Sequence, residues 1–275
     1  MLRDIVVHVD SLAENSARVA LACAVARDHG AHLAGVVVIH RPEVPGYARS
    51  QIGEKVLAAV AEAARVDAEA AGRKFSEQCD KAGVTAESRV DKGDLVETLA
   101  LHARYADLAV IGQNIGDDTS QTSVADRLIL NAARPVLVVP SAGKFAKVGE
   151  KVMVAWDAGR QATRAVNDAL PFLRKAKKVH VVSADPSQGR HAHGQVPGAD
   201  IGLHLARHGV NAEVSTLALG DDIDVGNALL SRAADFGADM IVMGAYGHAR
   251  LRELVLGGVT RLMLKEMTVP VLMSH

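Results

Sequence analysis

Short apolar runs recur along the whole chain, and longer stretches with the 3.6-residue periodicity of an amphipathic helix lie between most of them. The runs are rich in Val and Ile, which favours buried strands. A helix between consecutive strands makes those strands parallel, with right-handed crossovers. The pattern therefore predicts a doubly wound α/β fold with ten strands, at 5–9, 34–39, 85–90, 108–111, 136–139, 152–155, 179–183, 212–216, 240–243 and 271–273.

The second half of the chain repeats the plan of the first. DIVVHVD, which ends at Asp10, matches KVMVAWD, which ends at Asp157. DLAVIGQ matches DMIVMGA, and RPVLVVP matches VPVLMSH. A repeat of this length indicates two duplicated domains rather than a solenoid. We expect domains at 1–141 and 150–275, joined by the polar segment 142–150.

Composition narrows the class of protein. Hydrophobic residues make up 49% of the 275 residues and aromatics only 3%, which suits helices packed on a parallel sheet. The formal net charge of −1 gives no attraction to nucleic acid or to an anionic membrane. We expect neither a signal peptide nor a membrane-spanning helix, and a cytoplasmic location in which Cys23 and Cys79 are buried thiols.

A glycine-rich segment, GAYGHARLRELVLGG, follows the strand predicted at 240–243. Gly244 and Gly247 allow a sharp turn and a close approach of a ligand to the backbone. Gly257 and Gly258 precede RLMLKEM, which has helical periodicity. The first N–H groups of such a helix have no partner within it and attract anions, above all phosphate. Thr260 adds a hydroxyl, and a positive charge is available from Arg250, Arg252 or Arg261.

The spacing G-x2-G-x9-G, formed by Gly244, Gly247 and Gly257, resembles the nucleotide-binding pattern of the universal stress protein family. Asp157 at a strand end and the ALGDD turn near Gly220 fit the same family, and the match covers nearly the whole chain twice. The resemblance implies two tandem doubly wound parallel five-stranded sheets of order 3-2-1-4-5, of the adenine nucleotide alpha hydrolase-like type. It also implies ATP or another adenine nucleotide as ligand, with or without Mg²⁺.

Carried over to this sequence, the resemblance assigns a role to each part of the site. Asp157 accepts a hydrogen bond from the adenine or ribose edge, and Val182 lines the base. The expected nucleotide-binding residues are Asp157, Val182, Met243, Gly244, Gly247, His248, Gly257, Gly258, Val259 and Thr260. The chain departs from the family pattern at Gly258, where ATP-binding members carry Ser or Thr. A backbone amide survives that change, but a hydroxyl does not.

The corresponding loop of the first half, GQNIGDDTSQTSVADRL, departs further. It keeps Gly112, has Ile115 in place of the second glycine, and ends in Thr122 and Ser123. Asp117 and Asp118 put negative charge where phosphates would lie. We therefore expect no ATP binding in this half, and a structural role for Asp10.

Other polar residues have simpler interpretations. Asp157 is also a candidate N-cap or turn residue for the helix starting near Gln161. His191 and His193, and His204 and His208, have zinc-like spacing, but no cysteine or close carboxylate completes a site, so we expect no metal. The charged segment beginning at Ala61 is most simply a solvated helix face, with partner binding as the alternative.

The sequence contains no P-loop, nucleophile elbow, zinc-protease helix or dinucleotide fingerprint, so no catalytic residue is assigned. The main hypothesis is a nucleotide-binding sensor or regulator in the stress response, acting through an unidentified protein partner. One alternative is a nucleotide-free scaffold, and another is a weak ATPase whose acid or base is Asp157 or His248. In the fold that the resemblance implies, the strands at 136–139 and 271–273 lie at the sheet margin, and an apolar edge there needs covering, so we expect the two halves to pair there. Association of two whole chains into a homodimer stays open.

Overall fold

A computed structural model describes residues 1–39, 53–113, 123–184, 198–217, 224–247 and 258–275. Residues 40–52, which follow β2, lie outside these ranges. The strands are β1 (Asp4–Val9), β2 (His32–Ile39), β3 (Ala86–Lys92), β4 (Leu108–Gly112), β5 (Val136–Val139), β6 (Lys151–Trp156), β7 (Lys178–Ala184), β8 (Ala212–Leu217), β9 (Met240–Gly244) and β10 (Val271–Ser274). The helices are α1 (Asn15–His29), α3 (Glu54–Ala82), α4 (Leu95–Ala103), α5 (Val124–Asn131), α6 (Arg160–Leu173), α7 (Ala199–Arg207), α8 (Val225–Phe236) and α9 (Gly258–Glu266). Each predicted strand is present, displaced by no more than two residues at either end.

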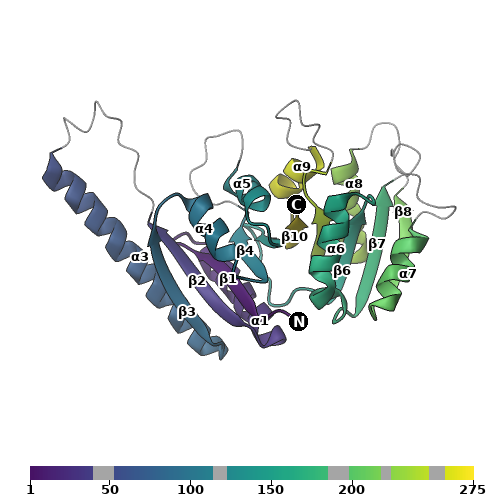
Figure 1. Cartoon of the computed structure of the whole chain (residues 1–275), viewed down its shortest axis with the longest axis horizontal. Coiled ribbons are helices and arrows are strands. Elements are labelled where there is room, and N and C mark those ends of the chain that lie inside the picture. The colour runs from purple at the N-terminus through teal and green to yellow at the C-terminus, as the bar shows by residue number, and fades with distance from the viewer. Residues whose placement is uncertain (40–52, 114–122, 185–197, 218–223, 248–257) are drawn as a thin grey trace.

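The strands form one sheet of order β3-β2-β1-β4-β5-β10-β9-β6-β7-β8. Each half has the predicted order 3-2-1-4-5, with parallel neighbours throughout. The two sets are not separate sheets, because β5 and β10 pair antiparallel with Leu137 opposite Leu272. The expected pairing of the two halves is thus confirmed. Figure 1 shows the halves meeting near β10, where the chain colour changes from teal to yellow.

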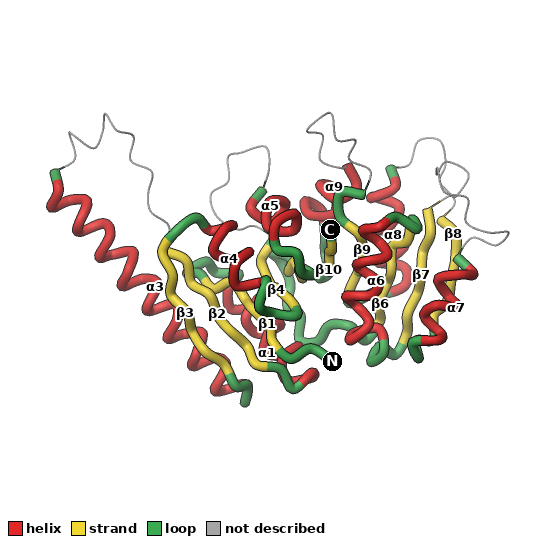
Figure 2. The backbone as a smooth tube through the Cα atoms, viewed as in Figure 1, coloured by secondary structure: helices red, strands yellow, loops and turns green. Residues whose placement is uncertain are grey.

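Helices cover both faces of this sheet (Figure 2). On one face α1, α3, α6 and α7 pack against residues such as Val7 and Val154, and on the other face α4, α5, α8 and α9 pack against residues such as Val6 and Met153. Successive strand residues point to opposite faces, so a strand buried on both sides needs apolar residues at every position. The continuous apolar runs in the sequence have this cause.

One pair of repeated residues has a structural role in both halves. Asp107 precedes β4, and its Oδ2 accepts hydrogen bonds from the backbone N–H groups of Arg3 and Asp4 at the start of β1. Asp239 precedes β9, and its carboxylate accepts from Gly149 and Glu150 just before β6. These carboxylates fix the amino ends of neighbouring strands, and in the second half they also anchor the segment 142–150, which is neither helix nor strand, as predicted.

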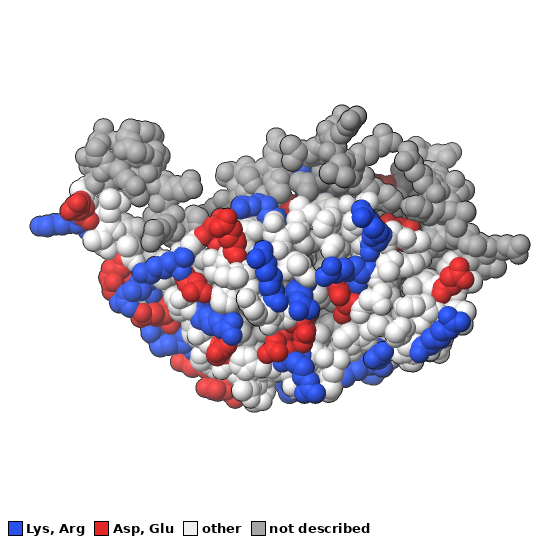
Figure 3. All heavy atoms as spheres, viewed as in Figure 1, with Lys and Arg blue, Asp and Glu red and all other residues white. Residues whose placement is uncertain are grey.

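The helix α3 is the longest of those described and is only partly packed. Its C-terminal part lies on β2, where Gly35 leaves room for the Phe75 ring. Toward its N-terminus Val56 and Val60 are exposed, and Figure 1 shows this end projecting beyond the sheet. Cys23 on α1 and Cys79 on α3 are buried free thiols, as expected. Within the described residues no helix is both long and apolar enough to cross a membrane. Positive and negative side chains intermingle on the face seen in Figure 3.

Candidate nucleotide site

A pocket of about 240 Å³ lies beyond the carboxyl ends of β6 and β9. In a doubly wound sheet this is the position where strand order reverses and ligands bind. Its lining includes all the predicted binding residues that the structure describes: Asp157, Val182, Met243, Gly244, Gly247, Gly258, Val259 and Thr260. His248, Gly257 and the ALGDD turn lie outside the described residues, as do Arg250 and Arg252.

The wall of the pocket nearest β6 carries Asp157. Its Oδ1 accepts a hydrogen bond of 2.8 Å from the backbone N–H of Gly159, the residue that caps α6. Asp157 is therefore a turn residue, one of the simpler roles considered for it, and it lies at the pocket as well. Both roles are compatible, because a carboxylate can accept more than one hydrogen bond.

The glycines at the pocket differ in how much space their surroundings leave for a side chain. A Cβ on Gly244 would lie 2.4 Å from the backbone nitrogen of Ala162, so α6 occupies the space that we expected a ligand to use. This glycine is required by the packing of β9 against α6. A Cβ on Gly247 would make ordinary contacts with Gln161 and Asp157, and one on Gly258 would have nothing within 4 Å. Gly258 is thus the position where a side chain can be added.

The first turn of α9 forms the far wall of the pocket. Gly258, Val259 and Thr260 begin this helix, so the unpaired N–H groups expected at a helix start lie beside the pocket. The Thr260 side chain is only 3% exposed, and its Oγ1 accepts a hydrogen bond of 3.3 Å from the N–H of Tyr246. The predicted phosphate-binding hydroxyl of Thr260 therefore also holds the loop after β9.

Sequence reasoning missed part of the lining, including Trp156 and Tyr246. Trp156 is the single tryptophan of the chain and immediately precedes Asp157, while Tyr246 lies between Gly244 and Gly247. Trp156 belongs to the first-strand motif that ends at Asp157, and Tyr246 belongs to the glycine motif. A large aromatic side chain inside a predicted binding motif could therefore have identified both as lining residues. The remaining missed residues are Ala155, Ala162, Val225 and Leu229. The last two come from α8, and no local pattern links that helix to the glycine loop.

Comparison with known proteins finds a family match for the half that contains this pocket. Residues 149–275 match the model of the universal stress protein family. This half of the chain is therefore similar to the universal stress protein family. A curated relative, universal stress protein Slr1230 of Synechocystis sp. (strain ATCC 27184 / PCC 6803 / Kazusa), is 29% identical over 155 residues, or 54% of this chain. The aligned region spans 49% of that relative, about half its length.

Solved structures extend the likeness to the whole chain at the level of fold. A universal stress protein from Archaeoglobus fulgidus DSM 4304 superposes with a TM-score of 0.75 over 98% of this chain and 95% of its own, at 15% identity. A universal stress protein described as putative, from Pseudomonas aeruginosa UCBPP-PA14, gives a TM-score of 0.61 over 99% and 93%, at 16% identity. The resemblance proposed from the glycine motif is confirmed, and the tandem fold is shared.

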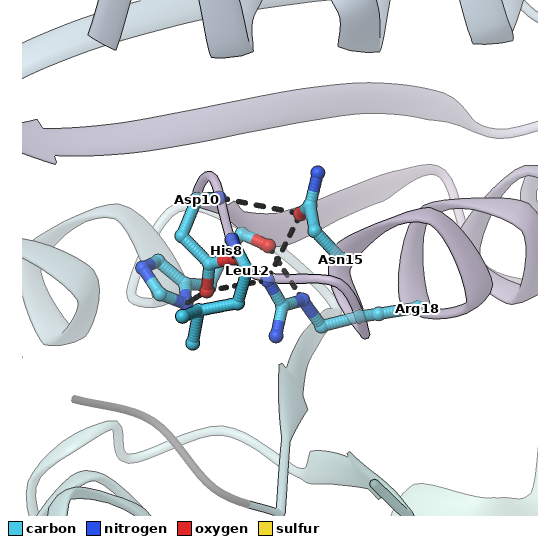
Figure 4. Close-up of polar contacts among 5 residues, drawn as sticks. All are labelled: His8, Asp10, Leu12, Asn15 and Arg18. Carbon is cyan, nitrogen blue, oxygen red and sulfur yellow. Dashed lines mark hydrogen bonds and ion pairs between the residues drawn. The ribbon is translucent and has the colours of Figure 1, made fainter. Parts of the chain in front are cut away.

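The first half has the same fold but a different site. Figure 4 shows Arg18, 1% exposed, reaching across to Asp10, where it pairs with Oδ2 at 2.7 Å. Asn15 accepts hydrogen bonds from the Asp10 N–H and from Arg18, and Asp10 Oδ1 accepts from Leu12 N–H. The structural role predicted for Asp10 is confirmed by these contacts.

A buried histidine completes this cluster. His8 Nδ1 lies 3.5 Å from Asp10 Oδ2 and makes no hydrogen bond with the described residues. Burial, together with the positive charge of Arg18, lowers the pKa of His8 to about 3, although Asp10 opposes the shift. His8 is therefore neutral at physiological pH. The cluster uses the Asp10 carboxylate for holding Arg18 in the interior.

In this half the helix that corresponds to α9 is α5, and side chains of its own first turn cap its N-terminus. Ser123 caps α5: its Oγ accepts from Asp126 N–H at 3.1 Å, while Asp126 Oδ2 accepts from the Ser123 N–H and hydroxyl at 2.9 and 2.8 Å. A carboxylate thus already satisfies the helix terminus. Ile115, Asp117, Asp118 and Thr122 lie outside the described residues.

The histidine pairs show no metal arrangement in the described part of the chain. The rings of His204 and His208 have centroids 4.6 Å apart, and Arg174 donates to the His208 backbone carbonyl. Among the described residues no group of three His, Cys, Asp or Glu side chains has metal-binding geometry. His191 and His193 lie outside them.

Proposed function

We propose that residues 150–275 bind one adenine nucleotide, ATP or AMP, in the pocket between β6, β9 and α9. The chain then acts in the cytoplasm as a sensor or regulator in the stress response, and occupancy changes the surface offered to a protein partner. The observation that carries this proposal is the convergence of the predicted binding residues on one pocket at the topological switch point.

The chemistry around the pocket supports a nucleotide rather than an unspecific apolar ligand. Val182 and Met243 offer an apolar surface to a base, and Asp157 offers a carboxylate to an exocyclic amine or a ribose hydroxyl. The start of α9, at Gly258, offers backbone N–H groups to a phosphate. A ligand with an apolar ring, donor groups and an anionic end matches this arrangement.

A stoichiometry of one nucleotide per chain is supported by the contrast between the halves. In the first half the carboxylate of Asp10 is paired with the buried Arg18, whereas in the second half Asp157 lies at a pocket of about 240 Å³. Its helix terminus at α5 already binds Asp126. Two bound nucleotides per chain in a native mass spectrum would contradict the assignment to one half.

The single tryptophan provides a direct binding assay, because Trp156 lines the pocket. Titration with ATP, AMP and GTP should change its fluorescence with saturation for the adenine nucleotides and more weakly for GTP. A nucleotide that binds only the native protein also raises the thermal midpoint. An unchanged emission and an unchanged midpoint at millimolar nucleotide would leave the nucleotide-free scaffold as the better hypothesis.

Asp157→Asn is the informative variant, because the amide keeps an oxygen for the Gly159 turn but removes the charge. We expect about tenfold weaker binding of ATP, the usual effect of losing one charge-assisted hydrogen bond. Asp235→Asn, on an exposed position of α8, is the matched control and should bind as the unmodified chain does. Equal affinity in both variants would remove Asp157 from the site.

A further inference from the structure

The pocket of the second half is held in shape by side chains of the first half. We propose that Tyr246 and Asp126 form a positioning pair across the two halves, which keeps residues 245–247, directly after β9, in their binding-competent conformation. This inference rests on the proposed nucleotide function for its effect on affinity. The contacts that carry it belong to described residues alone.

Tyr246 has a backbone conformation that needs an external cause. Its φ is 61°, in the left-handed region that a residue with a Cβ avoids unless its surroundings impose it. Within the second half, the contact described above between its N–H and Thr260 Oγ1 holds the backbone. The side chain, 4% exposed, points out of its own half.

The phenol hydroxyl donates a hydrogen bond to Oδ1 of Asp126, which lies 120 residues earlier in the sequence. Asp126 is 5% exposed and belongs to α5 of the first half. Its other oxygen is committed to the Ser123 cap, so the tyrosine completes the bonding of a buried carboxylate. Loss of the phenol oxygen would leave Oδ1 of Asp126 buried without this donor, which is unfavourable. The hydrogen bond therefore favours the one position of the Tyr246 ring that satisfies Asp126.

A second contact between the halves fixes the other wall of the pocket. The side-chain amide of Gln113, just after β4, donates to the carbonyls of Leu264 and Lys265 near the end of α9 at 2.8 and 2.9 Å. Its oxygen accepts from the N–H of Ser141 at 2.9 Å, which fixes the amide orientation. The first half therefore binds the C-terminal end of the helix whose N-terminal end lines the pocket. Figure 1 shows α5 and α9 near the middle of the molecule, where the halves join.

These contacts give the first half a role that does not need a ligand of its own. Its cap residue Asp126 serves two purposes: it closes the helix terminus of α5, and it anchors Tyr246 at the pocket of its neighbour. The first half thus acts as a rigid support for the pocket of the second half. Preorganisation of this kind improves affinity because the loop does not have to be ordered on binding.

The test compares Tyr246→Phe with Tyr105→Phe. Both variants remove one phenol oxygen, but Tyr105 is 80% exposed, in the first half. We expect Tyr246→Phe to weaken binding of ATP about tenfold and Tyr105→Phe to leave it unchanged. Ser274→Ala, which removes a buried hydrogen bond to Asp168 within the second half, controls for loss of stability and should also bind normally.

A measurement without nucleotide separates this inference from the proposed function. Acrylamide quenching of Trp156 should increase in Tyr246→Phe, because the released loop opens the shared pocket, and should not change in Tyr105→Phe. Asp126→Asn is the second variant, should Tyr246→Phe fail to fold, and should shift both readouts in the same direction.

Each result decides one question. If the unmodified chain binds ATP and Tyr246→Phe binds it equally tightly with unchanged quenching, the positioning pair is wrong and the nucleotide function stands. If the unmodified chain binds no nucleotide, the proposed function is wrong, and quenching alone decides whether the pair shapes the pocket. Weaker binding in Ser274→Ala to the same extent as in Tyr246→Phe would reduce the effect to general destabilisation and overturn the inference.

Discussion

Asp10 and Asp157 occupy the same place in two copies of one fold, and their neighbours give them different roles. Each follows the first strand of its half. Five residues after Asp10 comes Asn15 and eight after it Arg18, whereas the same steps from Asp157 lead to Ala162 and Ala165. In the first half Arg18 pairs with the Asp10 carboxylate, and Asn15 accepts a hydrogen bond from the Asp10 backbone N–H. In the second half Ala162 lines the pocket and Ala165 is buried.

An aspartate at the same position in both repeats is therefore weak evidence that both repeats have a binding site there. The carboxylate of Asp10 pairs with the buried Arg18, so its removal acts on stability. The carboxylate of Asp157 lies at a pocket of about 240 Å³, so we expect its removal to act on ligand binding. The side chains one and two helical turns further along decide between the two outcomes.

The largest expected effect is the loss of stability in Asp10→Asn. The change leaves the guanidinium of Arg18, with its side chain 2% exposed, without its opposite charge. Breaking such a buried pair from one side costs about 3 kcal/mol of unfolding free energy. Urea denaturation measures it, and Asp157→Asn should lose less than about 1 kcal/mol in the same experiment. Similar losses in the two variants would erase the distinction between the sites.

A smaller effect depends on pH and on His8, whose counterpart in the second half is Ala155. Its folded pKa of about 3 lies below the ordinary value of 6.5, so the unfolded chain binds the proton more tightly. The stabilising contribution is complete above pH 6.5 and is lost as the pH falls toward 3. Between pH 7 and 4.5 we expect this histidine to account for about 2.5 kcal/mol of lost stability.

Urea denaturation of His8→Gln at both pH values tests this expectation. The variant should show a smaller loss than the unmodified chain, whatever its stability at pH 7. His29, whose pKa burial lowers to about 4, is still present in the variant and contributes equally to both proteins. Identical pH dependence in the two proteins would mean that His8 is not the group that titrates.

The smallest expected effect is on ATP affinity, when the serine found at the start of α5 in the first half is introduced at the start of α9 in the second. Ser123 precedes a Val at the start of α5, as Gly258 does in α9, but its hydroxyl is committed to Asp126. A Cβ on Gly258 meets nothing within 4 Å, so Gly258→Ser should fit and offer a hydroxyl to a phosphate. We expect about fivefold tighter ATP binding by Trp156 fluorescence, and no change for Gly258→Ala. A gain in the alanine variant would point to the helix backbone instead.

Local patterns in the sequence predicted most of the elements. The strands near Val6 and Val154 were found because both faces of the sheet are covered, which makes every position apolar. The start of α6 was placed within one residue. The space taken by α6 at Gly244 was not foreseen, because the glycine signal is the same whether a ligand or a helix approaches.

The sequence predicted that the two halves pair at the strands 136–139 and 271–273, but only the tertiary structure gave the direction of that pairing and the side-chain contacts between the halves. The strands and the glycine motif follow from the sequence, since periodicity and turn chemistry are properties of neighbouring residues, whereas the order of the strands was implied by the resemblance to the universal stress protein family. The antiparallel pairing of β5 with β10 and the bond from Tyr246 to Asp126 join segments more than 100 residues apart. Such contacts depend on shape and burial at the place where the halves meet. A local pattern of side chains does not specify which distant segment it will contact.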